Sequence, residues 1–415
     1  MKMRPFGKLL PLETARDRLL AATIPIDRSG PIDVVEALGR VVAKPIRSPA
    51  EVPRFARATW DGYAIRAHET SRASAAAPAI FRIVGEVHAE EQYLPGIRPG
   101  ETVAIATGGM MPRGADTVVL FEDARVRGKL LRVPISVPPR SRIAPPGEEF
   151  HKGSRVAAPG DVLTPAALGT LSACGLRRVQ VYSRPIVTIV PNGNELAFPG
   201  ERLRTGQIFE GNNATIGAIV RASGGVVRTT PPVPDDPRRI EATLRDALRK
   251  SDLVIATGGS SVGEHDFLPA IFPRIGRLLF HGIAVRPGKP TLAVRWRNKL
   301  LVGMPGHPTS CFANALWLLM PTLRKLARWS GPGWVDIPLR LAGRSIEPNP
   351  SLSTVVLFHV EGNEATPPPP HTHAIAHFRG VDAFTIFPPG GRTIPPGRTI
   401  RVHRLYPPIS SPIVP

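Results

Sequence analysis

The stretch SDLVIATGGSSVGEHDFLP, residues 251–269, restricts the possible folds of this chain more than any other segment. It starts as a buried-strand run from Leu253 to Ala256, breaks at the Gly/Ser turn Thr257 to Ser261, and is expected to resume as a helix from about Asp266. An apolar run that opens into such a turn and then a helix is the βα step of an α/β fold. Because ligands of open α/β sheets bind at the carboxyl ends of the strands, the turn predicts a ligand site.

The composition of this turn indicates a bound phosphate. Adjacent glycines such as Gly258 and Gly259 let backbone N–H groups approach a phosphate closely, and a helix N-terminus favours its negative charge. Glu264 and Asp266 follow at once, and acidic groups beside a phosphate are best explained by a metal cation between them. The alternative is a plain turn with a capping Asp, since glycine-rich turns are common.

Length and charge limit the remaining possibilities. At 415 residues the chain should contain two to four domains. The net charge of +20 invites a nucleic-acid partner, but the basic residues are scattered and only 6% of residues are aromatic. We therefore expect no nucleic-acid partner, and anionic small ligands account for the charge equally well. Cys174 and Cys311 are too few for a disulfide framework or a zinc site.

The distribution of apolar residues bears on the compartment of the protein. No apolar run approaches the ~20 residues that span a membrane, and the N-terminus has no apolar signal-peptide core. We expect a cytoplasmic protein without membrane partners. The first segment is predicted to be an amphipathic helix with Leu12, Ala15, Leu19 and Leu20 on one face.

The first half of the chain then reads as a mixture of short elements. A helical stretch, IDVVEALGRVVA, is expected before Lys44-Pro45, and a strand at Gly62 to Ile65. Short alternating runs between Phe81 and Val137, separated by Gly and Pro, predict a small β-rich domain. A polar, proline-rich connecting segment follows from Pro138 to Gly160.

The second half predicts an α/β unit followed by β structure. Helices are expected at residues 165–174, 211–222, 238–250 and 310–329, and strands at 185–190, from 226, at 253–256, 292–294 and 300–303. Strands that alternate with helices imply a parallel sheet. Short strands at 338–341, 354–360, 383–387 and 399–403 predict a small all-β domain at the end of the chain.

Several motifs, in this order, carry a family resemblance. They are TWDGYA at 59–64, GEE at 147–149, NGNEL at 192–196, GGSSVGEHD at 258–266, RPGKP at 286–290 and MPGHP at 304–308. Their order and spacing resemble the molybdopterin molybdotransferases, the molybdenum insertases of the MoeA type, which include the C-terminal domain of gephyrin. The resemblance extends from about Leu12 to about His403.

The resemblance implies a multidomain α/β plus β fold in an elongated homodimer, with active sites shared between subunits. It implies a MogA-like three-layer α/β domain with a parallel-rich sheet, a small β-rich domain and a C-terminal β-barrel-like domain. The expected boundaries are an N-terminal helix at 1–29, a linking domain at 30–48 and 149–183, the small β-rich domain at 49–148, the molybdopterin-binding α/β domain at 184–332 and the C-terminal β domain at 333–415.

The resemblance also implies a reaction. Adenylylated molybdopterin and molybdate, or tungstate, would react with Mg²⁺ to give the metal-loaded cofactor and AMP. The substrate residues implied are Thr257, Gly258, Gly259, Ser260, Ser261, Val262, Gly263, Arg286, Lys289, Pro305, Gly306 and His307. The catalytic acids implied are Asp61, Glu149, Glu195, Asp235 and Asp266, of which Glu195, Asp235 and Asp266 would hold the metal.

Residue chemistry supports this site. Backbone N–H groups from Thr257 to Val262 and the cations Arg286 and Lys289 suit a polyanionic substrate. Mg²⁺ takes carboxylate oxygens and water. The alternatives are a surface role for Lys289, an Asx turn at Asp61, and a helix N-cap at Asp235 or Asp236.

This chain also departs from the family pattern. Glu149 stands where Asp is usual, His307 where Asn or Tyr is usual, and Asn192 and Asn194 where Thr and Asp are usual. These departures leave the handling of molybdate, and a preference for tungstate, open. Two alternative functions are a molybdopterin adenylyltransferase, whose turn is typically GGTG with an Arg-Asp pair, and a non-catalytic scaffold like part of gephyrin. The acidic residues and the additional β domains favour the insertase.

Overall fold

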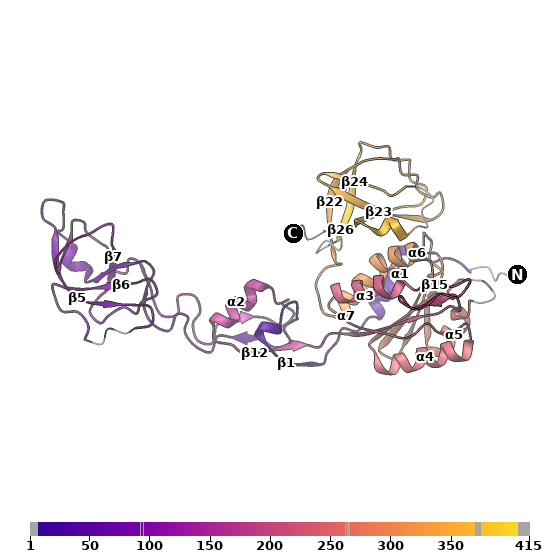
Figure 1. The fold of residues 1–415 in the computed structure, drawn as a ribbon, viewed down its shortest axis with the longest axis horizontal. Helices are drawn as coiled ribbons and strands as arrows, with labels where there is room; N and C mark the ends of the chain where they lie inside the picture. The colour runs from indigo at the N-terminus through magenta and orange to yellow at the C-terminus, as the bar shows by residue number, and fades with distance from the viewer. Residues whose placement is uncertain are drawn as a thin grey trace. The chain divides into compact units, whose positions relative to one another are not determined.

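The computed structural model describes residues 7–91, 93, 95–261, 263, 266–369 and 375–405. These form two compact units (Figure 1). Unit 1 consists of the described residues within Met1–Gly30, Gly39–Val41 and Val181–Pro415. Unit 2 consists of those within Pro31–Leu38 and Val42–Gln180. The chain passes between the units within β1 (Ser29–Asp33), on both sides of the short stretch Gly39–Val41, and within β12 (Arg178–Tyr182).

Unit 1 is built around a six-stranded sheet. Its strands lie in the order β16 (Val226–Thr229), β13 (Ile186–Pro191), β17 (Leu253–Thr257), β21 (Lys299–Met304), β20 (Leu292–Trp296) and β18 (Arg277–His281). The first four are parallel, whereas β20 and β18 are antiparallel to their neighbours. The parallel-rich sheet is therefore confirmed, and β18 and the antiparallel direction of β20 were not anticipated. Apolar runs such as LVIA in β17 suit strands buried on both faces.

Helices cover both faces of this sheet, which confirms the three-layer α/β domain (Figure 1). One face packs against α4 (Pro237–Lys250) and α5 (Leu268–Ile275). The other packs against α1 (Leu12–Ala22), α3 (Asn212–Ala222) and a helix that runs through α6 (Pro308–Asn314), the π-helical segment η3 (Ala315–Leu319) and α7 (Met320–Leu326). Alternate residues of β17 serve the two faces, with Ile255 in one core and Val254 in the other.

The predicted amphipathic helices match the structure closely. In α1, Leu12, Ala15 and Leu19 are fully buried, while Leu20 is half-buried. In α4 the side chain of Asp236 caps the helix by accepting hydrogen bonds from the N–H groups of Arg238 and Arg239, at 2.8 and 3.0 Å. Pro237 at the first helical position needs no hydrogen-bond partner for its nitrogen.

The C-terminal part of unit 1 is a closed β barrel, as predicted. The strands follow in the order β19 (Val285–Arg286), β23 (Ser353–Glu361), β24 (Glu364–Thr366), β22 (Trp334–Leu341), β26 (Thr399–Leu405) and β25 (Val381–Phe387). A further pairing of β23 with β25 closes the barrel. Leu339, Phe358 and Val402 fill its interior. The short strand β24 and the 3-10 helix η4 (Ile375–Phe378) were not anticipated.

Unit 2 contains the predicted β-rich region. Its sheet has the order β7 (Thr117–Leu120), β4 (Gly62–Ile65), β6 (Glu101–Ile105), β5 (Ala79–Val87), β9 (Leu130–Val133) and β8 (Arg125–Arg127). Smaller pairs join β3 (Arg57–Ala58) to β10 (Ile143–Ala144) and β2 (Ile46–Arg47) to β11 (Arg155–Ala157). The helix α2 (Pro165–Ala173) is capped by Thr164, and Gly175 follows it with a φ of +78°.

The helix predicted over IDVVEALGRVVA is wrong. Over this segment the chain forms the end of β1 and the short 3-10 helix η1 (Val34–Glu36), followed by irregular backbone from Leu38 to Lys44. Gly39 adopts a φ of +70°, which interrupts a helix. Val34, Ala37, Val41 and Val42 are nevertheless buried, so tertiary packing outweighs the local helical pattern.

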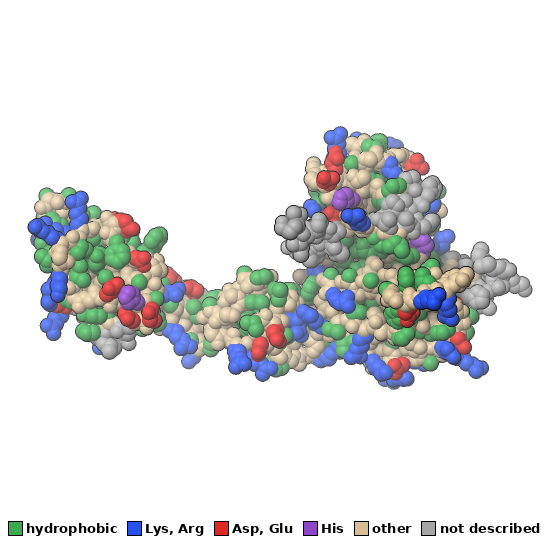
Figure 2. All heavy atoms as spheres, in the orientation of Figure 1, with side chains coloured by type: hydrophobic (Ala, Val, Ile, Leu, Met, Phe, Trp, Pro, Cys, Tyr) green, Lys and Arg blue, Asp and Glu red, His purple; other side chains and the backbone are tan. Residues whose placement is uncertain are grey.

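Two surface properties agree with the composition. Figure 2 shows Lys and Arg side chains dispersed over the visible face rather than gathered into one block. Among the described residues, no helix is both long and apolar enough to cross a membrane.

Candidate functional site

A pocket of ≈ 790 Å³ lies at the carboxyl ends of three parallel strands of unit 1, β13, β17 and β21. This is the edge at which α/β sheets bind ligands. The lining residues are Asn192, Gly193, Glu195, Ile208, Asp235, Gly258, Gly259, Ser260, Ser261, Gly263, Asp266, Pro290, Pro305, Gly306, His307, Pro308 and Ser310. The ligand site predicted from the Gly258-Gly259 turn therefore coincides with a real cavity.

Glycine is required at the turn that follows β17. Gly258 and Gly259 have φ values of +83° and +63°, in the left-handed region. A Cβ atom on Gly258 would lie 2.3 Å from the carbonyl oxygen of Asn192, and one on Gly306 would lie 3.2 Å from the Cα of Gly258. The loops after β13, β17 and β21 therefore meet backbone to backbone at Gly258, where a Cβ atom would not fit.

The turn offers fewer free N–H groups than the sequence suggested. The N–H of Gly258 donates to the carbonyl of Met304 at 3.2 Å. The N–H groups of Ser261 and Gly263 donate to the two carboxylate oxygens of Asp266, at 3.0 and 2.7 Å. Among the described residues, only the N–H groups of Gly259 and Ser260 in this turn have no protein acceptor. Val262, Glu264 and His265 lie outside the described residues.

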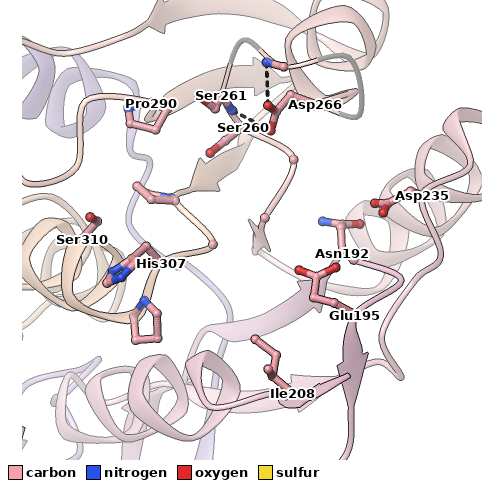
Figure 3. A pocket seen from close by; sticks show the side chains of 17 residues that line it. Asn192, Glu195, Ile208, Asp235, Ser260, Ser261, Asp266, Pro290, His307 and Ser310 are labelled. Atoms are coloured by element: carbon pink, nitrogen blue, oxygen red, sulfur yellow. Dashed lines mark hydrogen bonds between the residues drawn. The ribbon is translucent and has the colours of Figure 1, made fainter. Parts of the chain in front are cut away.

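Three of the predicted acids line the pocket. Figure 3 shows Glu195 and Asp235 near Asn192, while Asp266 lies beside Ser260 and Ser261. Asp235 is held by Asn194: its N–H donates to the Asn194 side-chain oxygen at 3.1 Å, and its Oδ2 accepts from the Asn194 N–H at 3.2 Å. Because Asp236 is the N-cap of α4, Asp235 remains available to the pocket.

These acids do not form a closed metal cage. Among the described residues, no group of three or more His, Cys, Asp or Glu side chains is arranged to hold a metal ion. Asp266 accepts two hydrogen bonds and Asp235 accepts one, and ionised carboxylates have further lone pairs beyond these. Any metal bound here would take some of its ligands from water or substrate.

The predicted substrate residues divide into two groups. Gly258, Gly259, Ser260, Ser261, Gly263, Pro305, Gly306 and His307 line the pocket. Thr257 is buried within β17, and Arg286 and Lys289 do not line the pocket, although Pro290 next to Lys289 does. The Arg286–Pro290 turn is fixed from inside, where the buried Asn314 donates to the Gly288 carbonyl at 2.7 Å.

Some lining residues were not singled out as site residues from the sequence. They are Asn192, Gly193, Ile208, Pro290, Pro308 and Ser310. Asn192 directly follows β13, a position that could have identified it by the same reasoning as the Gly258 turn. Its side chain is buried, its amide N–H donates to the carbonyls of Val190 and Thr257, and its Oδ1 has no partner among the described residues.

Asp61 and Glu149 belong to unit 2. Asp61 precedes β4 and accepts hydrogen bonds from the N–H and the hydroxyl of Thr107, at 2.7 and 2.8 Å. These bonds, the backbone N–H first, lower the pKa of Asp61, so the exposed carboxylate is ionised at neutral pH. Glu149 forms an ion pair with Arg57 at 3.0 Å.

The aromatic neighbours of Asp61 differ in exposure. Trp60 is 61% exposed. Tyr63 is half-buried and contacts Phe121 edge to face, with ring centroids 4.9 Å apart. Of the two, Trp60 is the ring available for a flat ligand.

Comparison with known proteins gives a consistent result. Residues 10–175 match a family described as the MoeA N-terminal region (domain I and II), and residues 188–325 match a probable molybdopterin binding domain. The chain is 30% identical over 376 residues to the molybdopterin molybdenumtransferase of Bacillus subtilis, covering 88% of this chain and 87% of that protein. It is 31% identical over 328 residues to the enzyme of the same name from Haemophilus influenzae, covering 78% and 80%.

Solved structures agree. The crystal structure titled molybdopterin biosynthesis moea protein from Pyrococcus horikosii matches with a TM-score of 0.82 and 30% identity, covering 96% of this chain and 99% of that chain. A second structure from Pyrococcus horikoshii OT3 matches with a TM-score of 0.83 and 27% identity.

Proposed function

The chain belongs to the molybdopterin molybdenumtransferase family of molybdenum cofactor biosynthesis, and we propose that it inserts molybdate into adenylylated molybdopterin with Mg²⁺-dependent release of AMP. The observation that carries the proposal is the pocket at the ends of β13, β17 and β21. It combines a glycine turn with carboxylates from three separate loops, at Glu195, Asp235 and Asp266. A polyanionic substrate and a hard cation together account for this combination.

The turn after β17 is the proposed phosphate end of the pocket. The N–H groups of Gly259 and Ser260 are the donors left there among the described residues. Ser310 contributes a hydroxyl to the lining. Lys289 lies one residue from the lining residue Pro290, and its long flexible side chain could reach an anion at the pocket margin.

The pocket residues fit Mg²⁺, which we propose as the metal. Mg²⁺ typically keeps several waters and takes one or two carboxylates together with substrate phosphates. Glu195, Asp235 and Asp266 provide oxygen donors of that kind without forming a complete cage. When bound there, Mg²⁺ would neutralise charge on the phosphate oxygens while the phosphoanhydride bond is cleaved.

Within this arrangement the protein groups have separate roles. Asn194 holds Asp235 toward the pocket through its reciprocal pair of hydrogen bonds. Asp266 fixes the turn by accepting from Ser261 and Gly263. A rigid turn places the Gly259 and Ser260 donors without reorganisation during the reaction.

We further propose a homodimer in which Asp61 and Glu149 of one subunit complete the pocket of the other. The support is that both acids belong to unit 2, whereas the pocket is formed within unit 1. Asp61 is ionised at neutral pH, so it cannot donate a hydrogen bond to molybdate and would repel it directly. It would act through a cation or by orienting the sulfur end of the pterin.

The direct test is incubation of the purified protein with adenylylated molybdopterin, Mg²⁺ and either molybdate or tungstate. We expect AMP to be released and the metal to be incorporated in equal amounts, only when Mg²⁺ is present. Parallel reactions with the two oxyanions determine which metal the chain prefers. AMP release without metal incorporation under every condition would contradict the proposed function.

A further inference from the structure

A short strap, formed by residues 196–209, lies beside the pocket and contributes Ile208 to its lining. It consists of β14 (Leu196–Ala197) and β15 (Ile208–Phe209), which pair in parallel and are joined by residues 198–207. The N–H of Ile208 donates to the Glu195 carbonyl at 2.8 Å, and the N–H of Glu210 donates to the Ala197 carbonyl at 2.9 Å. The strap is therefore tied to the chain directly beside the pocket acid Glu195.

The end of the strap is anchored at α3. Glu210 is buried, and its carboxylate accepts from the Asn213 N–H at 3.0 Å. Asn212 in turn donates to the carbonyl of the pocket residue Gly306 at 2.8 Å. Because Ile208 lies between this anchor and the bond to Glu195, its position relative to the pocket is fixed from both sides.

Ile208 differs from the other residues of the pocket wall. It is the one residue with a branched aliphatic side chain among the described lining residues, which otherwise are Gly, Ser, Pro, His, Asn and acids. Its side chain is 58% exposed. Covering a water-exposed aliphatic side chain with apolar ligand surface lowers the free energy of the complex. The position of Ile208 in the pocket wall therefore indicates an apolar surface on the ligand.

The neighbouring residue provides a contrast. Phe209 is 48% exposed but does not line the pocket, since successive strand residues point to opposite sides. In Figure 3, Ile208 lies next to Glu195 and well apart from Ser260 and Asp266 of the phosphate turn. A ligand that reached both places would need an apolar face at one end and phosphate at the other.

We propose that Ile208 forms a subsite for the face of a planar heterocyclic ring. This inference rests on the proposed function, in which the substrate carries two such rings, a pterin and an adenine, joined through phosphates. The ring face would cover Ile208, and the phosphates would extend toward Gly259 and Ser260.

The test compares Ile208→Ala with Phe209→Ala, which removes a similarly exposed apolar side chain from the same strap but outside the pocket. Calorimetric titration with adenylylated molybdopterin should give a Kd about five- to tenfold higher for Ile208→Ala and within about twofold of wild type for Phe209→Ala. Ile208→Leu should restore most of the affinity. Equal thermal unfolding of the three variants would show that none has lost its fold.

Two smaller probes identify the ring. If adenine occupies the subsite, Ile208→Ala weakens AMP as a competitor of the substrate; if the pterin does, it weakens pterin-6-carboxylate instead, and either result supports the subsite. The subsite proposal alone would be overturned if Ile208→Ala kept the wild-type substrate Kd and the wild-type rate of metal insertion. It would also be overturned if Ile208→Ala and Phe209→Ala lost the same affinity for the substrate. A wild-type chain that neither binds the substrate nor inserts metal would overturn the proposed function as well.

Discussion

Asp266 links the chemistry proposed for the pocket to the shape of its turn. Both of its oxygens accept backbone N–H groups, and it lines the pocket. Asp266→Asn replaces one acceptor by a donor and removes the charge available to Mg²⁺. We expect AMP release to fall by on the order of a hundredfold or more, with a higher Mg²⁺ concentration needed for half-maximal rate. Turnover and Mg²⁺ titration of the purified variant measure both effects.

The control for this substitution is Asp236→Asn. Asp236 follows the lining residue Asp235 in the chain but does not itself line the pocket. Asparagine also remains a good N-cap for α4. The activity of Asp236→Asn should remain near that of wild type. Near-normal turnover of Asp266→Asn at limiting Mg²⁺ would exclude Asp266 as a metal ligand.

Asp61 gives a second prediction, which separates binding from metal insertion. Its carboxylate is held by Thr107 in unit 2, away in the chain from the glycine turn. Asp61→Ala should bind adenylylated molybdopterin within a few-fold of wild type but fail to incorporate metal. Calorimetry and metal analysis of the product test the two steps separately. A loss of affinity beyond about tenfold, ~1.4 kcal/mol, would assign Asp61 to substrate capture instead.

The state of Asp61 also predicts the pH dependence. Hydrogen bonds from Thr107 lower the pKa of Asp61 below its ordinary value, which is about 3.9. The carboxylate therefore stays ionised as the pH falls from 7 to about 5. Over this pH range, the rate of metal insertion should depend on pH in the same way in wild type and in Asp61→Glu. A limb near pH 6 in the wild-type profile that shifts in Asp61→Glu would indicate a protonated Asp61 in the working enzyme.

Among the helices, α4 depends on a single cap. Asp236 accepts from the Arg238 and Arg239 N–H groups, and the Arg239 N–H is the largest cause of the lowered pKa of Asp236. Asp236→Ala leaves these donors unpaired, so the Tm should fall by roughly 2–4 °C, while Asp236→Asn should change it less. Scanning calorimetry at pH 7 measures the difference, and equal Tm values for both variants would contradict the capping role.

The same cap predicts a response to acid. A carboxylate with a lowered folded-state pKa stabilises the fold above its unfolded pKa, about 3.9, and this contribution is lost as the pH falls through the folded pKa. The Tm difference between wild type and Asp236→Ala should therefore be constant above about pH 5 and shrink below pH 4.

The assembly of two chains is tested by complementation. If Asp61 of one subunit faces Asp266 of the other, a heterodimer of Asp61→Ala and Asp266→Ala chains carries one intact site. Mixing the inactive variants should restore activity to up to about a quarter of wild type, because random exchange places half of the chains in heterodimers. Failure to recover activity after demonstrated subunit exchange would place both residues in the same subunit's site.

Sedimentation provides the complementary measurement. The wild-type chain should sediment as a dimer at micromolar concentration, and an active monomer would contradict the shared site. This prediction is independent of which residues contact the substrate.

The fold of unit 1 was largely readable from the sequence because its signals are local. Apolar runs bounded by Gly and Pro identified β13 and β17, and the amphipathic pattern identified α4. The Gly258-Gly259 turn also identified the pocket edge, since glycine adopts the observed positive φ values most readily. Turn chemistry of this kind operates over a few residues and needs no tertiary context.

Tertiary structure decided what depends on distant segments. The apolar pattern at 32–43 resembled a helix, but its residues are buried in short, irregular segments because Gly39 and the surrounding packing prevail. The proximity of Asp235 to Glu195 depends on the Asn194 hydrogen bonds between two loops. The occupied N–H groups of the glycine turn and the exposed Ile208 became visible only in three dimensions, because hydrogen-bond partners and solvent exposure are properties of packing.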